Sequence, residues 1–183
     1  MRILAFSSIR NEWFRTGTDI VYEKTKEILK KREYYTLSFT HTFEFDNDVV
    51  AFAYSYPYTY SDLRQFINNS LSSPYFRRER LCKTIAGYDC DILTITSEDR
   101  LKKQGVVFTG RVHPGETVGS WMVHGAIEFL LSEDPIAISL RSKFIFYIIP
   151  MLNPDGVIQG NYRTSLTGCD LNRKYLETTK VRK

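Results

Sequence analysis

A strand-loop-helix-strand pattern between residues 105 and 150 is the feature that most constrains the fold of this chain. Val106–Thr109 is a short β-branched and aromatic run typical of a buried strand, and Phe144–Ile149 is a second one. Between them lie a loop and then a segment, ending at Leu131, with the periodicity of an amphipathic helix. Its predicted apolar face consists of Val118, Met122, Ala126, Phe129 and Leu130. Strands joined through a helix lie parallel in one sheet, so we expect an α/β unit with a mostly parallel sheet.

The first part of the chain has a different pattern, in which hydrophobic and polar residues alternate. Along residues 35–45, Tyr, Leu, Phe and His occupy every second position, with Thr, Ser and Glu between them. Such alternation predicts a long antiparallel strand that is buried on one side. Asp46-Asn47-Asp48 supplies turn residues, and Val49–Tyr54 is predicted to return as the second strand of a hairpin. The 12 Tyr, 12 Phe and 2 Trp also favour β structure.

Further strands are predicted at Leu81–Ala86 and Asp91–Thr96, and Ser61-Asp62 can cap a helix between the hairpin and these strands. This helix runs through Leu63, Phe66, Ile67 and Leu71. The charged segment 98–105 then marks a change of pattern. We therefore expect a mixed β and α/β fold, with an antiparallel, sandwich-like β-rich domain over residues 1–98 and the first part of an α/β domain over residues 99–183.

The distribution of charge gives no support for a nucleic-acid partner. The net charge is +4, but residues 173–183 contain five basic residues and one acidic residue, whereas the other 172 residues contain 20 of each. A balanced body with a basic end is typical of a solvated tail. The apolar runs are too short for a membrane span or a secretory signal, and the three cysteines form no CxxC pair. We therefore expect a cytoplasmic protein in a reducing compartment.

A His-x-x-Glu pair lies in the loop that follows the first strand of the α/β unit. His113 and Glu116 flank Pro114-Gly115, and α/β sheets place their sites in loops at the carboxyl ends of parallel strands. One imidazole nitrogen and one carboxylate suit a catalytic zinc, and the glycine allows a tight turn that brings both to one ion. A loop histidine beside a helix-capping glutamate explains the same spacing, so the pair alone leaves both interpretations open.

Three later segments also contain candidate functional residues. Asn153-Pro154-Asp155-Gly156 follows the second strand and has strong turn chemistry. Gly160-Asn161-Tyr162-Arg163 and Asp170-Leu171-Asn172-Arg173 add two arginines and an asparagine in a Gly-rich region. A guanidinium offers a planar fork of donors that suits a carboxylate, although solvated surface arginines are the simpler interpretation of these segments alone.

In this order and spacing, HPGE, NPDGV, GNYR and DLNR resemble the motifs of the M14 class of zinc carboxypeptidases, and specifically of the cytosolic carboxypeptidase family, which trims glutamates from tubulin tails. The resemblance extends into the first half, where WFRTGTDIVY, YYTLSFTHTFEF, FAYSYPYTYSDL and LCKTIAG are similar to the β-rich domain that precedes the peptidase domain in that family. It implies a metalloprotease in the cytoplasm, with microtubule or cilium association as a further expectation.

The resemblance also implies roles for individual residues. His113 and Glu116 would be ligands of a Zn²⁺ ion that activates water and polarises the scissile carbonyl. Arg163 would be catalytic, binding the substrate and stabilising the oxyanion. Asn172 and Arg173 would bind the terminal carboxylate, which restricts such an enzyme to chain ends. The implied partners are protein or peptide C-termini, especially glutamate-rich tails such as those of tubulin, with no nucleic acid and no membrane.

The rest of the family's catalytic set has no counterpart in this sequence. A catalytic zinc needs three protein ligands, and the family supplies the third, a histidine, and later a general-base glutamate downstream of DLNR. His124 lies about 12 Å from Glu116 along one helix, too far to share an ion, and His41 is expected in a core or an interface. Because the first strands of the β-rich domain are also expected to be missing, we expect a fragment or truncated gene product with little or no activity.

Two other functions stay open at this stage. An amidohydrolase resembling succinylglutamate desuccinylase or aspartoacylase would share the His-x-x-Glu pair and a DLNR-like motif, although NPDGV and the aromatic β-rich half argue against it. A non-enzymatic module would instead dock its β-rich half on a partner such as microtubules and retain a vestigial metal site.

Overall fold

The computed structural model describes residues 2–25, 33–98 and 102–175, and the chain divides into two compact units. Unit 1 comprises residues 1–57, and unit 2 comprises residues 58–183. This division differs from the expected domain boundary after residue 98. Part of the charged segment 98–105, and the basic tail from residue 176 onward, lie outside the described residues.

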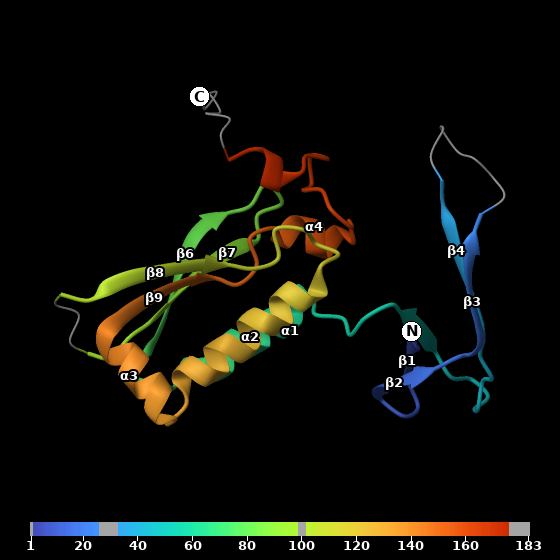
Figure 1. The fold of residues 1–183 in the computed structure, drawn as a ribbon, viewed down its shortest axis with the longest axis horizontal. Coiled ribbons are helices and arrows are strands. Elements are labelled where there is room, and N and C mark those ends of the chain that lie inside the picture. The colour runs from blue at the N-terminus through green and yellow to red at the C-terminus, as the bar shows by residue number, and fades with distance from the viewer. Residues whose placement is uncertain (1, 26–32, 99–101, 176–183) are drawn as a thin grey trace. The chain divides into compact units, whose positions relative to one another are not determined.

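Unit 1 consists of antiparallel β structure, as predicted for this part of the chain (Figure 1). β1 (Ile3–Ser7) is the central strand of a three-stranded sheet, between β2 (Glu12–Thr16) and β5 (Val50–Ala53). β3 (Thr18–Lys24) and β4 (Tyr35–Thr40) form a two-stranded ribbon. The predicted hairpin of residues 35–45 with residues 49–54 is therefore wrong, because β4 pairs with β3 and β5 pairs with β1.

The carboxylate of Asp48 explains why β5 lies beside β1. Asp48 accepts hydrogen bonds from the Ser7 and Ser8 hydroxyls at 2.6 and 2.8 Å and from the Ile9 amide at 3.2 Å. The Ser8 amide in turn donates to the Val49 carbonyl at 3.1 Å. These bonds fix the residues that lead into β5 at the end of β1, so the chain cannot turn back along β4.

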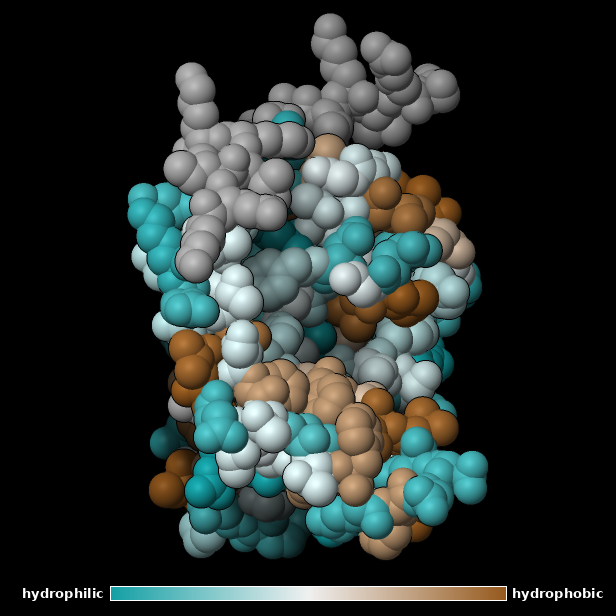
Figure 2. All heavy atoms as spheres, turned by 90° about the vertical axis from the view of Figure 1, so that its right-hand side faces the viewer, coloured by the Kyte–Doolittle hydropathy of each residue, from teal (hydrophilic) through white to brown (hydrophobic). Residues whose placement is uncertain are grey.

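The predicted burial of one face of residues 35–45 is also wrong. Tyr35 is 53% exposed and Phe43 is 64% exposed. Figure 2 shows hydrophobic side chains, in brown, among hydrophilic ones on the surface of the molecule. A two-stranded ribbon has no second layer of its own that could bury such side chains. His41 is half-buried, and its Nδ1 atom lies 2.8 Å from the Thr16 hydroxyl.

Unit 2 contains a four-stranded sheet with the strand order β6-β7-β9-β8. The strands are β6 (Phe76–Lys83), β7 (Asp89–Ile95), β8 (Gln104–Thr109) and β9 (Phe144–Ile149). β8 and β9 are parallel, which confirms the predicted β-α-β unit. The other two pairings are antiparallel, so the prediction of a mostly parallel sheet is wrong. Because β6 and β7 complete this sheet, the residues before 98 cannot be separated from those after it.

Helices α1 (Tyr60–Ser70) and α2 (Thr117–Leu131) cover one face of this sheet, and α3 (Pro135–Lys143) leads into β9 (Figure 1). Thr59 caps α1 in a reciprocal arrangement with Asp62, two residues before the predicted Ser61-Asp62 cap. The core between the helices and the sheet includes Ile67, Leu93, Ile127 and Ile148, each fully buried.

The predicted apolar face of α2 is only partly correct. Leu130 is buried, but Val118 is 62% exposed and Met122 is 70% exposed. Ser120, Val123 and Ile127 are the other buried residues of the helix. Apolar residues surround this helix on most sides, so the hydrophobic pattern does not define a single buried face.

We predict that Asp48→Asn destabilises unit 1 in a pH-dependent way. The hydrogen bond from the Ser7 hydroxyl lowers the pKa of the Asp48 carboxyl below its ordinary value of about 3.8. Burial acts in the opposite direction, but the bond from Ser7 and smaller contributions from Ser8 and Ile9 together outweigh it. A carboxyl whose pKa is lowered by folding contributes stability above its unfolded pKa and loses it as the pH falls through the folded pKa. Denaturant midpoints of the wild type and variant should therefore differ near pH 6, and the difference should shrink as the pH falls below about 3.8. Asp46→Asn, an exposed residue of the same turn, is the control, and an equal gap at both pH values would contradict the prediction.

Candidate functional site

The loop between β8 and α2 is shaped by a buried arginine. Arg111 has a positive φ of 56° and is 6% exposed. Its Nε donates to the Pro114 carbonyl at 2.7 Å, and its Nη1 donates to the Tyr58 carbonyl at 3.0 Å and the Ser120 hydroxyl at 2.9 Å. The guanidinium thus ties the loop to α2 and to the segment before α1. The sequence alone predicted no role for this arginine, because its partners are defined only in three dimensions.

Two glycines allow three loops to pack against one another. The Gly115 amide donates to the Tyr162 carbonyl at 2.7 Å, and a Cβ atom at Gly115 would lie 2.4 Å from the Tyr162 ring. A Cβ atom at Gly156 would lie 2.5 Å from Cγ of Pro114 and 2.6 Å from the Thr164 carbonyl oxygen. The glycines of HPGE and NPDG therefore serve close contact between loops as well as local turns.

Asn153 connects the loop after β9 to the loop after β8. Its Oδ1 accepts from the Gly156 amide at 3.1 Å and caps α4 (Pro154–Gln159), and its Nδ2 donates to the Val112 carbonyl at 3.2 Å. Asn153 is 2% exposed, so both hydrogen bonds satisfy buried polar groups. The segment predicted as a turn thus also supports the residue next to His113.

His113 and Glu116, the predicted pair, lie together at the carboxyl end of β8. His113 Nδ1 is 3.0 Å from Glu116 Oε1, and His113 Nε2 is 3.0 Å from Asp170 Oδ1. The His113 side chain is 8% exposed and that of Glu116 is 52% exposed. Glu116 occupies the N-cap position of α2, but its side chain makes no capping hydrogen bond. The helix-capping interpretation of Glu116 is therefore wrong, and its carboxylate interacts with His113 instead.

Asp170 links His113 to the remaining predicted site residues. Its Oδ2 accepts from Arg163 Nε at 2.7 Å, and its Oδ1 also accepts from the Asn172 amide at 3.0 Å. Burial alone would raise the pKa of the Asp170 carboxyl, but hydrogen bonds from His113, Arg163 and the Asn172 amide outweigh burial and hold that pKa below its usual value. Asp170 is therefore an anion that accepts from two different loops. Asp170 is the first residue of the DLNR segment but was not predicted as a site residue.

Arg163, Asn172 and Arg173 are exposed beside this cluster. The Arg163 side chain is 44% exposed. Asn172 and Arg173 belong to the 3₁₀ turn η1 (Leu171–Arg173), which Asp170 caps, and the Arg173 amide donates to the Asp170 carbonyl at 3.1 Å. The structure thus places four of the five predicted site residues in contact with Asp170, and the fifth, Glu116, on the other nitrogen of His113.

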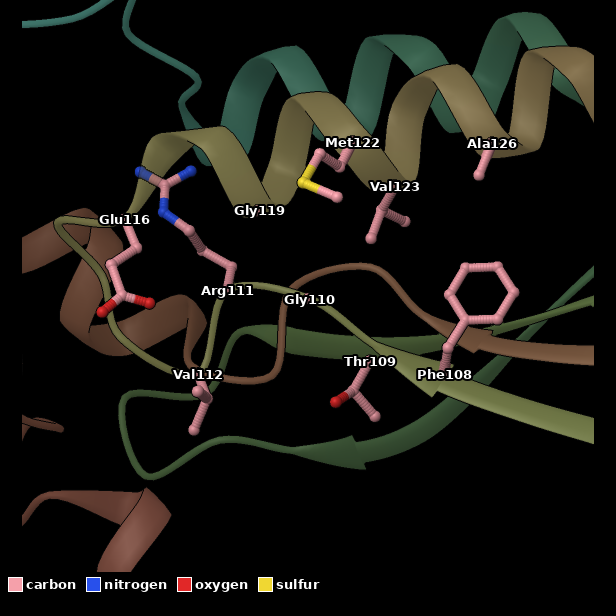
Figure 3. Close-up of a pocket in the computed structure, with 10 residues that line it drawn as sticks. All are labelled: Phe108, Thr109, Gly110, Arg111, Val112, Glu116, Gly119, Met122, Val123 and Ala126. Carbon is pink, nitrogen blue, oxygen red and sulfur yellow. The ribbon is translucent and has the colours of Figure 1, made fainter.

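An apolar cavity of about 410 Å³ lies between β8 and α2, beside Glu116 (Figure 3). Phe108, Met122, Val123 and Ala126 line its apolar part, and Arg111 and Glu116 lie at the end nearest the loop. The cavity places nonpolar surface next to a partly exposed carboxylate.

The donor atoms of His113 and Glu116 fit a zinc ion in chemistry and in spacing. Two ligands of a tetrahedral zinc, each roughly 2.0–2.2 Å from the ion, lie about 3.3 Å apart, close to the 3.0 Å found between Nδ1 and Oε1. Within residues 2–25, 33–98 and 102–175, no group of three or more His, Cys, Asp or Glu side chains is arranged to hold a metal.

His124 takes part in packing away from this cluster. It stacks on Phe66, with 3.7 Å between the ring centroids, and its Nδ1 lies 3.0 Å from the Tyr58 hydroxyl. Burial raises the pKa of Tyr58 to about 12, so this hydroxyl keeps its proton while it is hydrogen-bonded to His124. No described helix is long and apolar enough to cross a membrane.

The chain is similar in sequence to known zinc carboxypeptidases. The family model for zinc carboxypeptidases matches residues 64–181, and the chain belongs to this family. It is 48% identical over 177 residues to cytosolic carboxypeptidase 2 of Xenopus tropicalis, covering 92% of this chain and 18% of that protein. It is 45% identical to cytosolic carboxypeptidase 4 of Mus musculus, covering 91% and 17% respectively. The chain thus spans about a fifth of the length of these relatives.

Solved structures of metallo-carboxypeptidases have a similar fold. A metallo-carboxypeptidase from Burkholderia cenocepacia superposes with a TM-score of 0.77 and 29% identity, covering 96% of this chain and 44% of that one. A metallo-carboxypeptidase from Pseudomonas aeruginosa superposes with a TM-score of 0.72 and 26% identity, covering 96% and 43%. The fold is therefore that of part of a metallocarboxypeptidase.

We predict that Gly156→Ala destabilises the protein, whereas Gly125→Ala does not. The new methyl group at residue 156 would overlap Pro114 and Thr164, which should cost about 1–3 kcal/mol of unfolding free energy. Gly125 lies in α2 with nothing within 4 Å of its Cβ position, and alanine there should stabilise by about 0.5–1 kcal/mol. Urea unfolding of both variants measures the difference, and equal effects of the two substitutions would contradict it.

Proposed function

We propose that the chain contributes the first half of the active site of a zinc metallocarboxypeptidase that removes C-terminal acidic residues from proteins. The observation that carries this proposal is the His113–Glu116 pair at the carboxyl end of β8, with Asp170 on the opposite nitrogen of the same imidazole. Membership of the zinc carboxypeptidase family supports it.

In this proposal His113 Nδ1 and Glu116 would hold the zinc ion, which would supply Lewis-acid activation of a water molecule and of the scissile carbonyl. Asp170 is then a positioning residue. By accepting from Nε2 it fixes the ring orientation and leaves Nδ1 directed toward Glu116.

Arg163 and Arg173 suit contact with a substrate because both are exposed and both bond to Asp170, Arg163 through its side chain and Arg173 through its amide. Arg163 is fixed by its Nε bond to Asp170, so its guanidinium is oriented before a substrate arrives. We assign Arg163 to the scissile carbonyl and Asn172 with Arg173 to the terminal carboxylate. The Pseudomonas aeruginosa relative was solved with (2-guanidinoethylmercapto)succinic acid, a compound with two carboxyl groups, which supports carboxylate recognition by this fold.

The preferred substrates in this proposal are glutamate-rich C-terminal tails such as those of tubulin, encountered in the cytoplasm and at microtubules or cilia. The support is the similarity of the chain to proteins named cytosolic carboxypeptidases. Because His113 and Glu116 give two donors and a catalytic zinc uses three, we propose that the 183-residue chain alone has little or no activity. The family match favours a peptidase over an amidohydrolase and over a purely tubulin-binding module.

We predict that zinc binding depends on the proposed pair. His113→Ala and Glu116→Gln should each weaken zinc affinity by at least about tenfold, since changes to residues that only orient a ligand already cost roughly 10–100-fold. Equilibrium dialysis with zinc alone measures this, and circular dichroism checks the fold. His124→Ala is the matched control, because His124 lies in packing and not beside Glu116. If His124→Ala weakens zinc binding as much as His113→Ala, the assigned site is wrong.

The same assay separates the role of Asp170 from a merely structural one. Asp170→Asn should weaken zinc affinity by about 10–100-fold because the uncharged amide no longer supports His113 as a ligand. Asp170→Glu should restore part of the affinity. A loss of folding stability without a change in zinc affinity would leave Asp170 with no positioning role.

We predict that the chain distinguishes a free peptide C-terminus from a blocked one. A short polyglutamate peptide with a terminal carboxylate should bind at least about tenfold more tightly than its C-terminal amide, because two charge-assisted hydrogen bonds are lost in the amide. Arg173→Ala should remove this difference, whereas Arg77→Ala, at an exposed arginine of β6, should not. Isothermal titration calorimetry measures it, and equal affinity for both peptides in the wild type would refute the carboxylate site.

A further inference from the structure

Two of the three cysteines lie opposite each other on neighbouring strands of unit 2. Cys82 of β6 and Cys90 of β7 are paired in the antiparallel register, directly after the irregularity between Arg80 and Cys82. Residues opposite each other in an antiparallel pair have Cβ atoms roughly 4.5–5.5 Å apart, and the Cα separation of such pairs lies within the range that a disulfide spans. The backbone therefore already holds the two residues at a spacing from which a bond can form.

The two thiols differ in their access to solvent. β6 is an edge strand of the sheet, and Cys82 is exposed, whereas Cys90 is 3% exposed and donates to the Met151 carbonyl at 3.6 Å. Both line a cavity of about 250 Å³ that also contains Leu81, Ile85 and Asn153. A small oxidant can thus reach the Cys82 thiol, whereas the Cys90 thiol is shielded from solvent.

The electrostatics of the pair fit this order of events. Burial raises the pKa of Cys90 to about 12, and interactions with Cys82 contribute in the same direction. Cys90 therefore remains a thiol under ordinary conditions, and the sulfur accessible to an oxidant is the exposed one at Cys82.

We propose that Cys82 and Cys90 form a reversible disulfide across β6 and β7 in the presence of a peroxide. The Cys82 thiolate attacks one peroxide oxygen, the O–O bond breaks, and water leaves after protonation, which gives a sulfenic acid. The Cys90 sulfur then attacks the Cys82 sulfur, the S–O bond breaks, and the hydroxide leaves as water with the Cys90 proton. Two electrons pass from the two sulfurs to the peroxide, and a dithiol reductant reverses the reaction.

The bond would restrain a hairpin that supports the loops near the candidate site. The turn between the two cysteines closes through the Thr84 amide bonded to the Tyr88 carbonyl at 2.9 Å. Its Ala86 amide donates to the Asp155 carboxylate at 3.2 Å, at the start of α4. A disulfide closes this short loop covalently and removes conformations from the unfolded chain, so oxidation should stabilise the fold. This inference does not depend on the proposed peptidase function.

The test is oxidation of the purified chain with hydrogen peroxide, followed by intact mass, maleimide labelling and peptide mapping. We expect the mass of two hydrogen atoms to be lost, only Cys169 to remain labelled, and the melting midpoint to rise by roughly 5 °C. Dithiothreitol should reverse all three changes. Cys169→Ser should behave as the wild type, and Cys82→Ser should show no shift on oxidation.

Other outcomes would overturn the proposal. These are a Cys82–Cys169 or intermolecular bond in place of the cross-strand bond, over-oxidation of Cys82 while Cys90 stays reduced, and a complete cross-strand bond that lowers the melting midpoint. Since the wild-type measurement needs no substitution at Cys90, a variant that fails to fold does not affect the result.

Discussion

The carboxylate of Asp170 is the interaction on which the candidate site depends. It accepts from His113 Nε2, from Arg163 Nε and from the Asn172 amide, and so joins residues that are 57 and 7 positions away in sequence. A carboxylate with charge-assisted and backbone donors around it is both fixed in place and kept ionised. Without it, the ring of His113 would have no partner on its second nitrogen, and the 3₁₀ turn η1 would lose its cap.

Three loops must approach closely before Asp170 can make these contacts. β8 and β9 are adjacent and parallel, so the loops that follow them start at the same edge of the sheet. Asn153 then joins the two loops through Val112, and the glycines at 115 and 156 remove the side-chain atoms that would hold them apart. The buried Arg111 satisfies the Pro114 carbonyl inside the same loop and the Tyr58 carbonyl before α1. The arrangement thus results from satisfying buried polar groups in a small volume.

Local sequence patterns predicted individual strands and helices better than they predicted which strands pair. β9 was predicted with its observed bounds, and the strand, loop and helix around His113 were also correct. The pairing of β5 with β1 could not be predicted, because it depends on Asp48 reaching Ser7 and Ser8 from 40 residues away. The buried face of α2 was only partly predicted for a different reason, since Met122 and Ile127 are both apolar but only Ile127 belongs to the core. The roles of the candidate site residues were inferred from the family resemblance. The contact of Asp170 with His113, by contrast, could be recognised only from the structure.

The charges around His113 explain why these side chains suit a divalent cation better than an anion. Glu116 and Asp170 supply two carboxylates, and Arg163 supplies one guanidinium. With a neutral imidazole, which is the form that binds metal, the cluster carries one net negative charge. Arg163 compensates Asp170 on the Nε2 side, so the uncompensated charge is that of Glu116 on the Nδ1 side. A positive ion would therefore be attracted to the nitrogen that faces Glu116.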